Sequence, residues 1–427
     1  MKTTFQQVKG TREFFPSQMA IRRWLYSMIE RVSILYGYQE YDGPFLEKIE
    51  LYSAKSGEEL VKQQAFVFPD RGGELITLRP ELTLSLARMV AEKQKELVYP
   101  IRWWSFGPFW RYERPQKGRT REFFQWNIDL IGTSSSEADA ELISICAVFF
   151  RVIGINPEQV KILINDRNLM DTELISIGIK DDLRKEVFRI IDKRGKMKKE
   201  DWQATAIDAG LSQEQLEKLV TLLDNKDLWK KSQNLRNIFK TLENLGVSDF
   251  VAYEPQVIRG LDYYTGVVFE AWDVGGDGRA VLGGGHYDNL IGDVGGDALA
   301  GVGFAMGDVM ITLLLEKYGK LPKLNIFEDT VLVTVFSEEF FEKSQIIATR
   351  LRNFGIKTIL YPEISKLNKQ LKFADRSGIK IVVVIGPDEV EKHCVAIKDL
   401  SKSTQEIAPE AEVEEKIMQL LAQEMAV

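Results

Sequence analysis

At residues 106–132 the sequence reads FGPFWRYERPQKGRTREFFQWNIDLIG, two aromatic-rich runs that flank a short loop. The second run alternates between apolar and polar residues: Phe124, Trp126, Ile128 and Leu130, with Gln125, Asn127 and Asp129 between them. A period of two predicts a strand with one apolar face and one polar face. The segment therefore predicts a β-hairpin whose polar face carries an amide, a second amide and a carboxylate.

The loop of this hairpin is basic in an acidic chain. The loop and its flanks contain five basic residues, Arg111, Arg114, Lys117, Arg119 and Arg121, and two acidic residues, Glu113 and Glu122. Such a loop would suit a polyphosphate ligand, because arginine binds phosphate through two parallel hydrogen bonds. A solvated, charged turn explains the same pattern, so the local sequence leaves both interpretations open.

Length and composition narrow the class of protein. A chain of 427 residues is too long for one typical core and indicates two or three domains. Hydrophobic content of 44% and charged content of 28% are those of an ordinary soluble globular protein. A net charge of −7 excludes a generally basic nucleic-acid binder but permits locally focused basic residues.

Other absences in the sequence exclude several chemistries. His286 and His393 are the two histidines, so few candidates exist for a histidine-dependent triad or a structural zinc site. The sequence has no Gly-x4-Gly-Lys-Ser/Thr loop, so phosphate chemistry would have to use arginines. The sequence contains no signal-peptide core and no apolar run of transmembrane length. We therefore expect a cytoplasmic protein that does not bind a membrane.

A strand-to-helix junction lies at residues 75–90. The run 75–80 predicts a strand that stops at Pro80, and a helix is expected from Glu81 onward. Glu81 and Thr83 would then stand where ligand contacts are common. Glu81 could equally offset the positive end of the helix dipole.

Two further regions follow. Residues 168–241 are charged and helical in pattern, which predicts an inserted helical subdomain. Strand patterns return at 257–272 and 279–288, joined by a glycine-rich turn that predicts a second hairpin. Arg259 lies in an apolar context in this hairpin and would need an anionic partner.

The C-terminal region, 328–427, predicts an α/β unit in the order β-α-β-α-β-β-α. Its segment 343–402 holds twelve lysines or arginines and six acidic residues. This excess would suit a polyanionic partner, although a solvated surface is the commoner meaning of scattered lysines.

Five segments in order carry a family resemblance. They are residues 77–83, 109–125, 259–266, 283–288 and 369–376. The chain resembles class II histidyl-tRNA synthetases over nearly its full length. In this order, the five segments are similar to the family's amino-acid-binding strand, its motif 2, its two histidine-specific signatures and a run of its anticodon-binding domain.

The resemblance implies an α+β fold. A class II antiparallel-sheet catalytic domain would occupy 1–322, with the helical insertion at 168–241 inside it. An α/β anticodon-binding domain would occupy 328–427. The resemblance also implies a homodimer formed through the N-terminal domain, use of ATP with Mg²⁺, and the substrates L-histidine and histidine tRNA. Histidyl-adenylate would form first, and the histidyl group would then pass to the 3′ end of the tRNA.

Roles follow from motif position. Arg111 and Arg259 are similar to the two arginines on the ATP α-phosphate, and Glu113, Arg119 and Arg121 would also bind ATP. The histidine-binding set would be Glu81, Thr83 and Gln125 at the α-amino group, Asp129 and Tyr264 at the imidazole, and Tyr263 and Tyr287 lining the pocket. Arg114, Gln116 and Lys117 would bind the acceptor end of the tRNA. Lys369 and Lys372, in the C-terminal domain, would also bind the tRNA. No metal site with fixed protein ligands is implied.

The sequence departs from the family pattern at three positions. Met310 stands where class II motif 3 usually has the arginine that holds the γ-phosphate, and we hypothesise that Arg119 or Arg121 supplies the missing charge. Asp129 stands where many bacterial members have glutamate, and His286 where arginine is commoner. An inactive paralogue, such as the regulatory subunit of ATP phosphoribosyltransferase, is the alternative, but it lacks the histidine signatures and the anticodon-binding domain.

Overall fold

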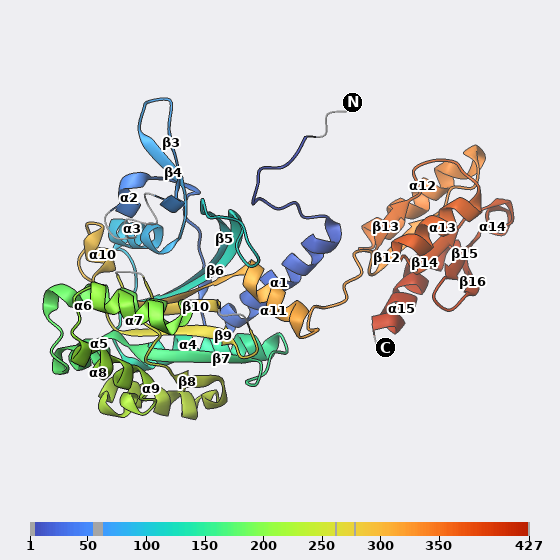
Figure 1. Cartoon of the computed structure of the whole chain (residues 1–427). Coiled ribbons are helices and arrows are strands. Elements are labelled where there is room, and N and C mark those ends of the chain that lie inside the picture. Colours follow the sequence, from blue (N-terminus) through green and yellow to red (C-terminus); the bar gives the residue numbers. More distant parts are fainter. Residues whose placement is uncertain (1–4, 54–62, 261–262, 277–278, 426–427) are drawn as a thin grey trace. The chain divides into compact units, whose positions relative to one another are not determined.

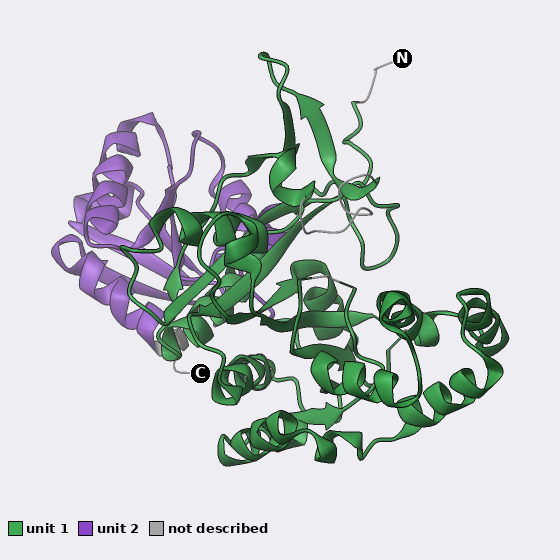
Figure 2. Ribbon diagram, turned by 90° about the vertical axis from the view of Figure 1, so that its left-hand side faces the viewer, with its two compact units in different colours: residues 1–13, 22–321 green, residues 14–21, 322–427 purple. Residues whose placement is uncertain are grey.

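The computed structural model describes residues 5–53, 63–260, 263–276 and 279–425. The chain divides into two compact units (Figure 2). The first unit contains residues 1–13 and 22–321, and the second contains residues 14–21 and 322–427. Figure 1 shows the order of helices and strands along the chain. No helix in the described ranges is long and apolar enough to cross a membrane.

Eleven of the described strands precede residue 322: β1 (Gln39–Glu40), β2 (Leu46–Lys48), β3 (Phe66–Pro69), β4 (Leu75–Leu78), β5 (Ile101–Trp110), β6 (Glu122–Ile131), β7 (Val160–Asp166), β8 (Val251–Tyr253), β9 (Val267–Asp273), β10 (Ala280–Tyr287) and β11 (Gly301–Gly307). The α-helices in this part are α1 (Pro16–Leu35), α2 (Ile49–Ser53), α3 (Thr83–Lys93), α4 (Ser136–Val152), α5 (Arg167–Ser176), α6 (Asp181–Lys193), α7 (Lys199–Asp208), α8 (Gln213–Asp224), α9 (Gln233–Asn244), α10 (Leu290–Asp293) and α11 (Asp308–Lys317).

One large sheet organises the first unit. Its eight strands run in the order β1-β5-β6-β11-β10-β9-β7-β8, and all neighbours are antiparallel except β1 with β5 and β7 with β8. The predicted hairpin is confirmed as β5 and β6, with Trp103 opposite Asp129 and Trp110 opposite Glu122. A separate three-stranded antiparallel sheet has the order β2-β4-β3.

The two faces of the large sheet differ in composition. On one face Trp126, Ile128 and Phe304 belong to the main apolar core, together with residues of α1 and α4. Burying aromatic and branched side chains in this way is the dominant favourable term in folding. The polar residues of β6 alternate with the apolar ones and therefore face the other side. Residues of α3 and α10 share a smaller core with Tyr264 and Tyr287 on that side.

The structure differs from two sequence expectations near this face. Residues 257–260 and 263–266 do not join the second hairpin, and β9 begins at Val267. Arg259 has φ of 58°, a left-handed conformation that is incompatible with an extended strand. The helix expected from Glu81 begins at Thr83, with Leu82 at the N-cap. Glu81 thus precedes the helix, after the break made by Pro80.

Helices α5 to α9 follow one another between β7 and β8 (Figure 1). The start of α8 has a capping box, in which Ser212 and Gln215 satisfy each other's backbone N–H groups. The indole of Trp202 is buried and donates a 2.7 Å hydrogen bond to the carbonyl oxygen of Ile190. The capping box fixes the start of α8, and the Trp202 hydrogen bond joins α7 to α6.

The second unit contains β12 (Thr330–Val333), α12 (Glu338–Asn353), β13 (Lys357–Leu360), α13 (Leu367–Ser377), β14 (Ile381–Val384), α14 (Pro387–Glu391), β15 (Cys394–Asp399), β16 (Thr404–Pro409) and α15 (Val413–Met425). Its sheet has the order β13-β12-β14-β15-β16, parallel over the first three strands and antiparallel over the last three. The sequence missed β16, because this edge strand is exposed at every residue except Ala408 and has no apolar alternation.

Candidate active site

Glycines line the polar face of the large sheet and leave room for functional side chains. Pairing places Asp129 opposite Gly303 and Gly303 opposite Gly285. A Cβ atom built on Gly303 would lie 2.0 Å from Oδ1 of Asp129, and one built on Gly283 would lie 1.5 Å from Nη1 of Arg259. These side chains therefore lie directly over glycine backbone, which no other residue type would allow.

The predicted histidine-binding residues meet on this face. The hydroxyl of Tyr287 donates a 3.0 Å hydrogen bond to Oδ1 of Asp129, and the hydroxyl of Tyr263 donates a 3.4 Å hydrogen bond to Oε2 of Glu81. The rings of Tyr263 and Tyr264 have centroids 4.8 Å apart. Two carboxylates and three phenols thus converge from four separate segments of the chain.

Thr83 and Gln125 stand at the edge of this group. Thr83 is the first residue of α3 and lies close enough to Tyr263 to influence the pKa of that phenol. Gln125 lies on the same face of β6 as Asp129, but four residues, about 13 Å, further along the strand. The backbone carbonyl oxygen of Gln125 accepts a 3.4 Å hydrogen bond from the side-chain amide of Asn127.

Burial controls the acid–base behaviour of these groups. Burial raises the pKa of Asp129 to about 7; the Tyr287 hydrogen bond acts against this rise, and the charge of Glu81 adds to it. Burial also holds the pKa values of Tyr263 and Tyr287 well above that of a free phenol. The tyrosines therefore remain hydrogen-bond donors at neutral pH, while Asp129 can exchange a proton.

Two arginines lie beside this group. Nη1 of Arg259 is 2.9 Å from Oε1 of Glu270, whose other oxygen accepts a 3.0 Å hydrogen bond from the Trp272 indole. The anionic partner predicted for Arg259 is thus Glu270. Nε of Arg111 donates a 2.9 Å hydrogen bond to the carbonyl oxygen of Pro80, and its terminal nitrogens make no hydrogen bond to any residue that the structure describes.

The loop between β5 and β6 separates its charged residues. Arg119 pairs with Glu113 at 3.0 Å, while the guanidinium of Arg121 stacks over the Tyr112 ring at 4.1 Å. The predicted acceptor-end residues, Arg114, Gln116 and Lys117, are exposed. In the second unit, Lys369 and Lys372 are exposed on α13, and Lys369 pairs with Glu363.

Sequence reasoning missed Arg79 and did not name Glu270. Arg79 is fully buried and donates hydrogen bonds to Asp42 at 2.5 Å and to the carbonyl oxygen of Pro108 at 2.9 Å. It thereby ties the end of β4 to β5, next to Glu81. An arginine inside an apolar strand pattern was the available signal for such a role, because a buried guanidinium needs several acceptors.

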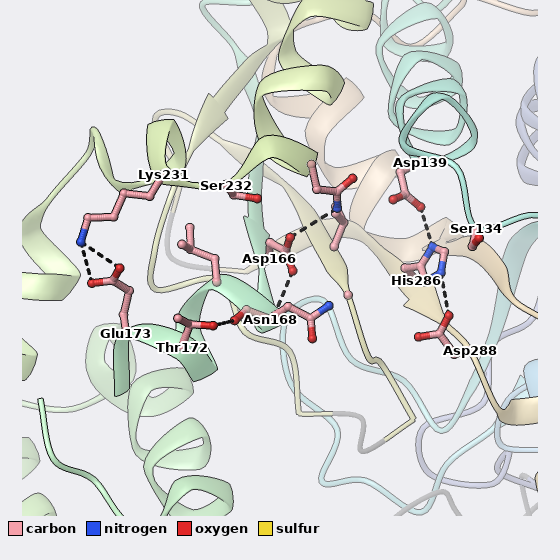
Figure 3. Close-up of a pocket in the computed structure, with 14 residues that line it drawn as sticks. Ser134, Asp139, Asp166, Asn168, Thr172, Glu173, Lys231, Ser232, His286 and Asp288 are labelled. Atoms are coloured by element: carbon pink, nitrogen blue, oxygen red, sulfur yellow. Dashed lines mark hydrogen bonds and ion pairs between the residues drawn. The ribbon is translucent and has the colours of Figure 1, made fainter. Parts of the chain in front are cut away.

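A second pocket lies on the opposite face of the sheet and contains none of the predicted site residues. Its volume is about 520 Å³, and its lining comes from α4, the end of β7, α5, the start of α9 and β10. In Figure 3, His286 lies between two carboxylates: Nδ1 is 2.8 Å from Asp139, and Nε2 is 3.3 Å from Asp288. Burial of the imidazole acts to lower its pKa, but these two carboxylates outweigh burial and raise it.

Comparison with known proteins places this chain in a family. The model of the histidyl-tRNA synthetase family matches residues 10–309, and that of an anticodon binding domain matches residues 330–420. The chain belongs to the histidyl-tRNA synthetase family. The large antiparallel-rich sheet with the C-terminal anticodon-binding domain is the class II fold predicted from the sequence.

Relatives in the family match over most of their length. A histidine–tRNA ligase of Leptospira biflexa is 34% identical, over 99% of each chain. A chloroplastic/mitochondrial histidine–tRNA ligase of Arabidopsis thaliana is 37% identical, over 93% of this chain and 83% of the relative.

Solved structures agree on the fold. The histidyl-tRNA synthetase of Nostoc sp. PCC 7120 has a TM-score of 0.82 at 26% identity and covers 98% of this chain and all of its own. A Bacillus halodurans C protein described as an ATP phosphoribosyltransferase regulatory subunit/histidyl-tRNA synthetase has a TM-score of 0.73 over 88% of this chain and 97% of its own. Its 22% identity supports a shared fold only.

Proposed function

We propose that the chain activates L-histidine with ATP and transfers the histidyl group to the 3′ end of histidine tRNA. The observation that carries this proposal is the cluster of Asp129, Tyr287, Glu81 and Tyr263 next to Arg259, in a chain with full-length histidine–tRNA ligase relatives. The inactive-paralogue alternative is not favoured, because the histidine-specific segments and the anticodon-binding domain are both present.

In this proposal the imidazole of histidine is read by Asp129 and Tyr264. An imidazole offers one N–H donor and one acceptor nitrogen, which a carboxylate and a phenol can each satisfy. Tyr287 orients Asp129 through their hydrogen bond, and Tyr263 lines the pocket. Glu81, Thr83 and Gln125 would hold the α-amino group. A site built on buried hydrogen bonds rejects amino acids that lack the partner by roughly 10⁴-fold or more.

The first chemical step would need no nucleophile from the protein. The histidine carboxylate is already ionised and attacks the α-phosphorus of ATP, so that a phosphorus–oxygen bond forms and pyrophosphate leaves. Arg111 and Arg259 would stabilise the charge on the phosphoryl oxygens as fixed cations. Glu113, Arg119 and Arg121 would help to hold ATP. Mg²⁺ would enter with the nucleotide, held largely by its phosphates.

The second step would use the exposed loop tip and the second unit. Arg114, Gln116 and Lys117, which are exposed, would contact the acceptor end of the tRNA, and Lys369 and Lys372 would contact its anticodon region. We propose 1–322 as the catalytic domain, 168–241 as an insertion in it and 328–427 as the anticodon-binding domain, a division that agrees with the matched family ranges.

We further propose a cytoplasmic homodimer formed through the N-terminal domain. Apolar side chains are exposed on or next to the three-stranded sheet: Phe45, Leu46, Val67, Phe68 and Leu75. An exposed apolar group of this kind commonly marks a protein interface. Light scattering should give about twice the chain mass of 48.8 kDa.

Histidine-dependent exchange of pyrophosphate into ATP tests the proposed activity. The pure protein with Mg²⁺ should catalyse this exchange, and omission of histidine should abolish it. Absence of exchange in folded protein would contradict the proposal.

A further inference from the structure

Three segments meet where motif 3 of the family has its arginine. Met310 lies in the first turn of α11, and its side chain reaches the tip of the basic loop at Gly118. A Cβ atom on Gly118 would lie 2.6 Å from Sδ of Met310 and 3.9 Å from Nη1 of Arg279. Arg279 immediately precedes β10. The guanidinium of Arg279 and the end of the Met310 side chain therefore both lie next to Gly118.

No counter-ion of Arg279 is found among the residues that the structure describes. Its Nη1 atom is buried without a hydrogen-bond partner, and its guanidinium forms no ion pair within the part of the chain that the structure describes. A guanidinium remains protonated at any physiological pH. An unpaired cation that is partly withdrawn from water costs stability. Such a group is more readily understood as one arm of a ligand site than as a structural element.

The surrounding charges strengthen this interpretation. The charged groups that act on Arg279 are Arg119 and Glu113, and Glu113 already pairs with Arg119 at 3.0 Å. Burial lowers the pKa of Arg279, the positive charge of Arg119 lowers it further, and Glu113 opposes both effects. Two cations therefore share one carboxylate, which leaves a net positive charge for an anion.

We propose that Arg279 binds the terminal phosphate of ATP, and with it the pyrophosphate product, in place of the arginine that Met310 replaces. This assignment rests on the proposed activation of histidine by ATP. Arg119 is engaged with Glu113, and Arg121 is stacked on Tyr112. Arg279 is thus the arginine of this group with no described partner, and it lies, like Met310, next to Gly118.

The test compares Arg279→Ala with the wild type in histidine-dependent ATP–pyrophosphate exchange. One charge-assisted hydrogen bond corresponds to about a 10- to 100-fold change in binding. The KM values for ATP and for pyrophosphate should rise by this factor, while the KM for histidine should not change. A non-hydrolysable histidyl-adenylate analogue, which has no β- or γ-phosphate, should bind both proteins equally. Arg189→Ala, at an exposed position on α6, is the matched control.

Two further variants refine the test. Arg279→Lys keeps the charge without the paired donors and should fall between wild type and alanine; it also serves if the alanine variant fails to fold. Arg279→Ala combined with Met310→Arg should regain part of the ATP affinity. The thermal midpoint of Arg279→Ala without ligand should not fall, because the arginine has no described partner to lose.

Each contrary outcome has a distinct meaning. Unchanged KM values for ATP and pyrophosphate in Arg279→Ala would overturn the role of Arg279 while leaving histidine activation intact. Equal weakening of ATP and of the adenylate analogue would also overturn it, because the effect would then not lie at the terminal phosphates. No exchange by the wild type would overturn the proposed function itself.

Discussion

Tyr287 donates a 3.0 Å hydrogen bond to Asp129 across 158 residues of sequence, at the buried centre of the candidate site. The two residues come from strands that are not neighbours in the sheet, because β11 lies between β10 and β6. Gly301 and Gly303 on β11 leave the space through which the side chains meet. The pair thus depends on three strands at once.

Removal of the Tyr287 hydroxyl should weaken histidine binding. Burial raises the pKa of Asp129 to about 7, and the Tyr287 hydrogen bond limits this rise. Tyr287→Phe should therefore leave more Asp129 protonated and unable to accept an imidazole N–H. We expect the KM for histidine to rise about 10-fold, and by more at pH 6.5 than at pH 8. Steady-state exchange kinetics measure this change.

Tyr253→Phe is the matched control for that variant. The Tyr253 hydroxyl is also buried, but it has no hydrogen-bond partner in the described part of the chain. Its removal should leave the KM for histidine unchanged. Equal effects of the two variants would show that loss of any buried phenol, rather than the bond to Asp129, is responsible.

Addition of one methyl group at Gly283 should impair catalysis without unfolding the protein. The new Cβ would meet the end of the Arg259 side chain, a flexible group that can move, rather than the backbone. Gly283→Ala should therefore keep a near-native thermal midpoint but lose about 100-fold in kcat/KM for exchange, because Arg259 is displaced. Gly195→Ala adds the same methyl group into open space, in the short 3-10 helix at residues 194–196 that follows α6. It should retain activity, and a similar loss in both variants would refute the steric explanation.

Asp129 should make the stability of the ligand-free protein depend on pH. Its pKa of about 7 lies above the value near 3.9 of an unfolded aspartate. Between these values the folded state retains a proton that the unfolded state has lost, so this group contributes less stability as the pH rises toward 7. Asp129→Asn removes this effect. The thermal midpoint of the variant relative to wild type should increase from pH 5 to pH 7.5, and a constant difference would contradict the assigned pKa.

His286 should have its own pH dependence. Burial acts to lower the pKa of the imidazole, but Asp139 and Asp288 raise it above 6.5, the value of a free histidine. The stability that His286 contributes is therefore fully present below pH 6.5. This stability is lost as the pH rises through the pKa of the folded state. His286→Gln should lower the free energy of unfolding by about 1.5–3 kcal/mol at pH 6. The loss should be smaller at pH 9. Urea denaturation at the two pH values measures the difference, and an equal loss at both would mean that His286 is neutral throughout.

The position of His286 also explains a departure from the family pattern. The sequence indicated the loss of a permanent charge where arginine is commoner. In the fold, two carboxylates hold the imidazole and favour its protonated form. The positive charge is thus present when the imidazole is protonated. It lies on the face of the sheet opposite the candidate site, because His286 and Tyr287 are adjacent in one strand.

The sequence by itself determined the hairpin of β5 and β6, the apolar and polar faces of β6 and the order of the family segments. Period-two alternation and a basic loop are local properties that a chain carries in its residue order. It also predicted that Arg259 needs an anion, since a partly buried guanidinium requires one. It could not name Glu270, nor place Arg79 against Asp42, because these contacts join segments far apart in sequence.

Only the tertiary structure decided which residues share the site. The sequence does not show which side chains lie over the glycines of β10 and β11. Strand pairing aligns these glycines beneath Asp129, Arg259 and Tyr264. Strand register, set by the whole sheet, fixes which side chains lie over that glycine floor. In the same way Arg279 had no signal in the sequence, and its position next to Met310 arises because β10, α11 and the basic loop pack together.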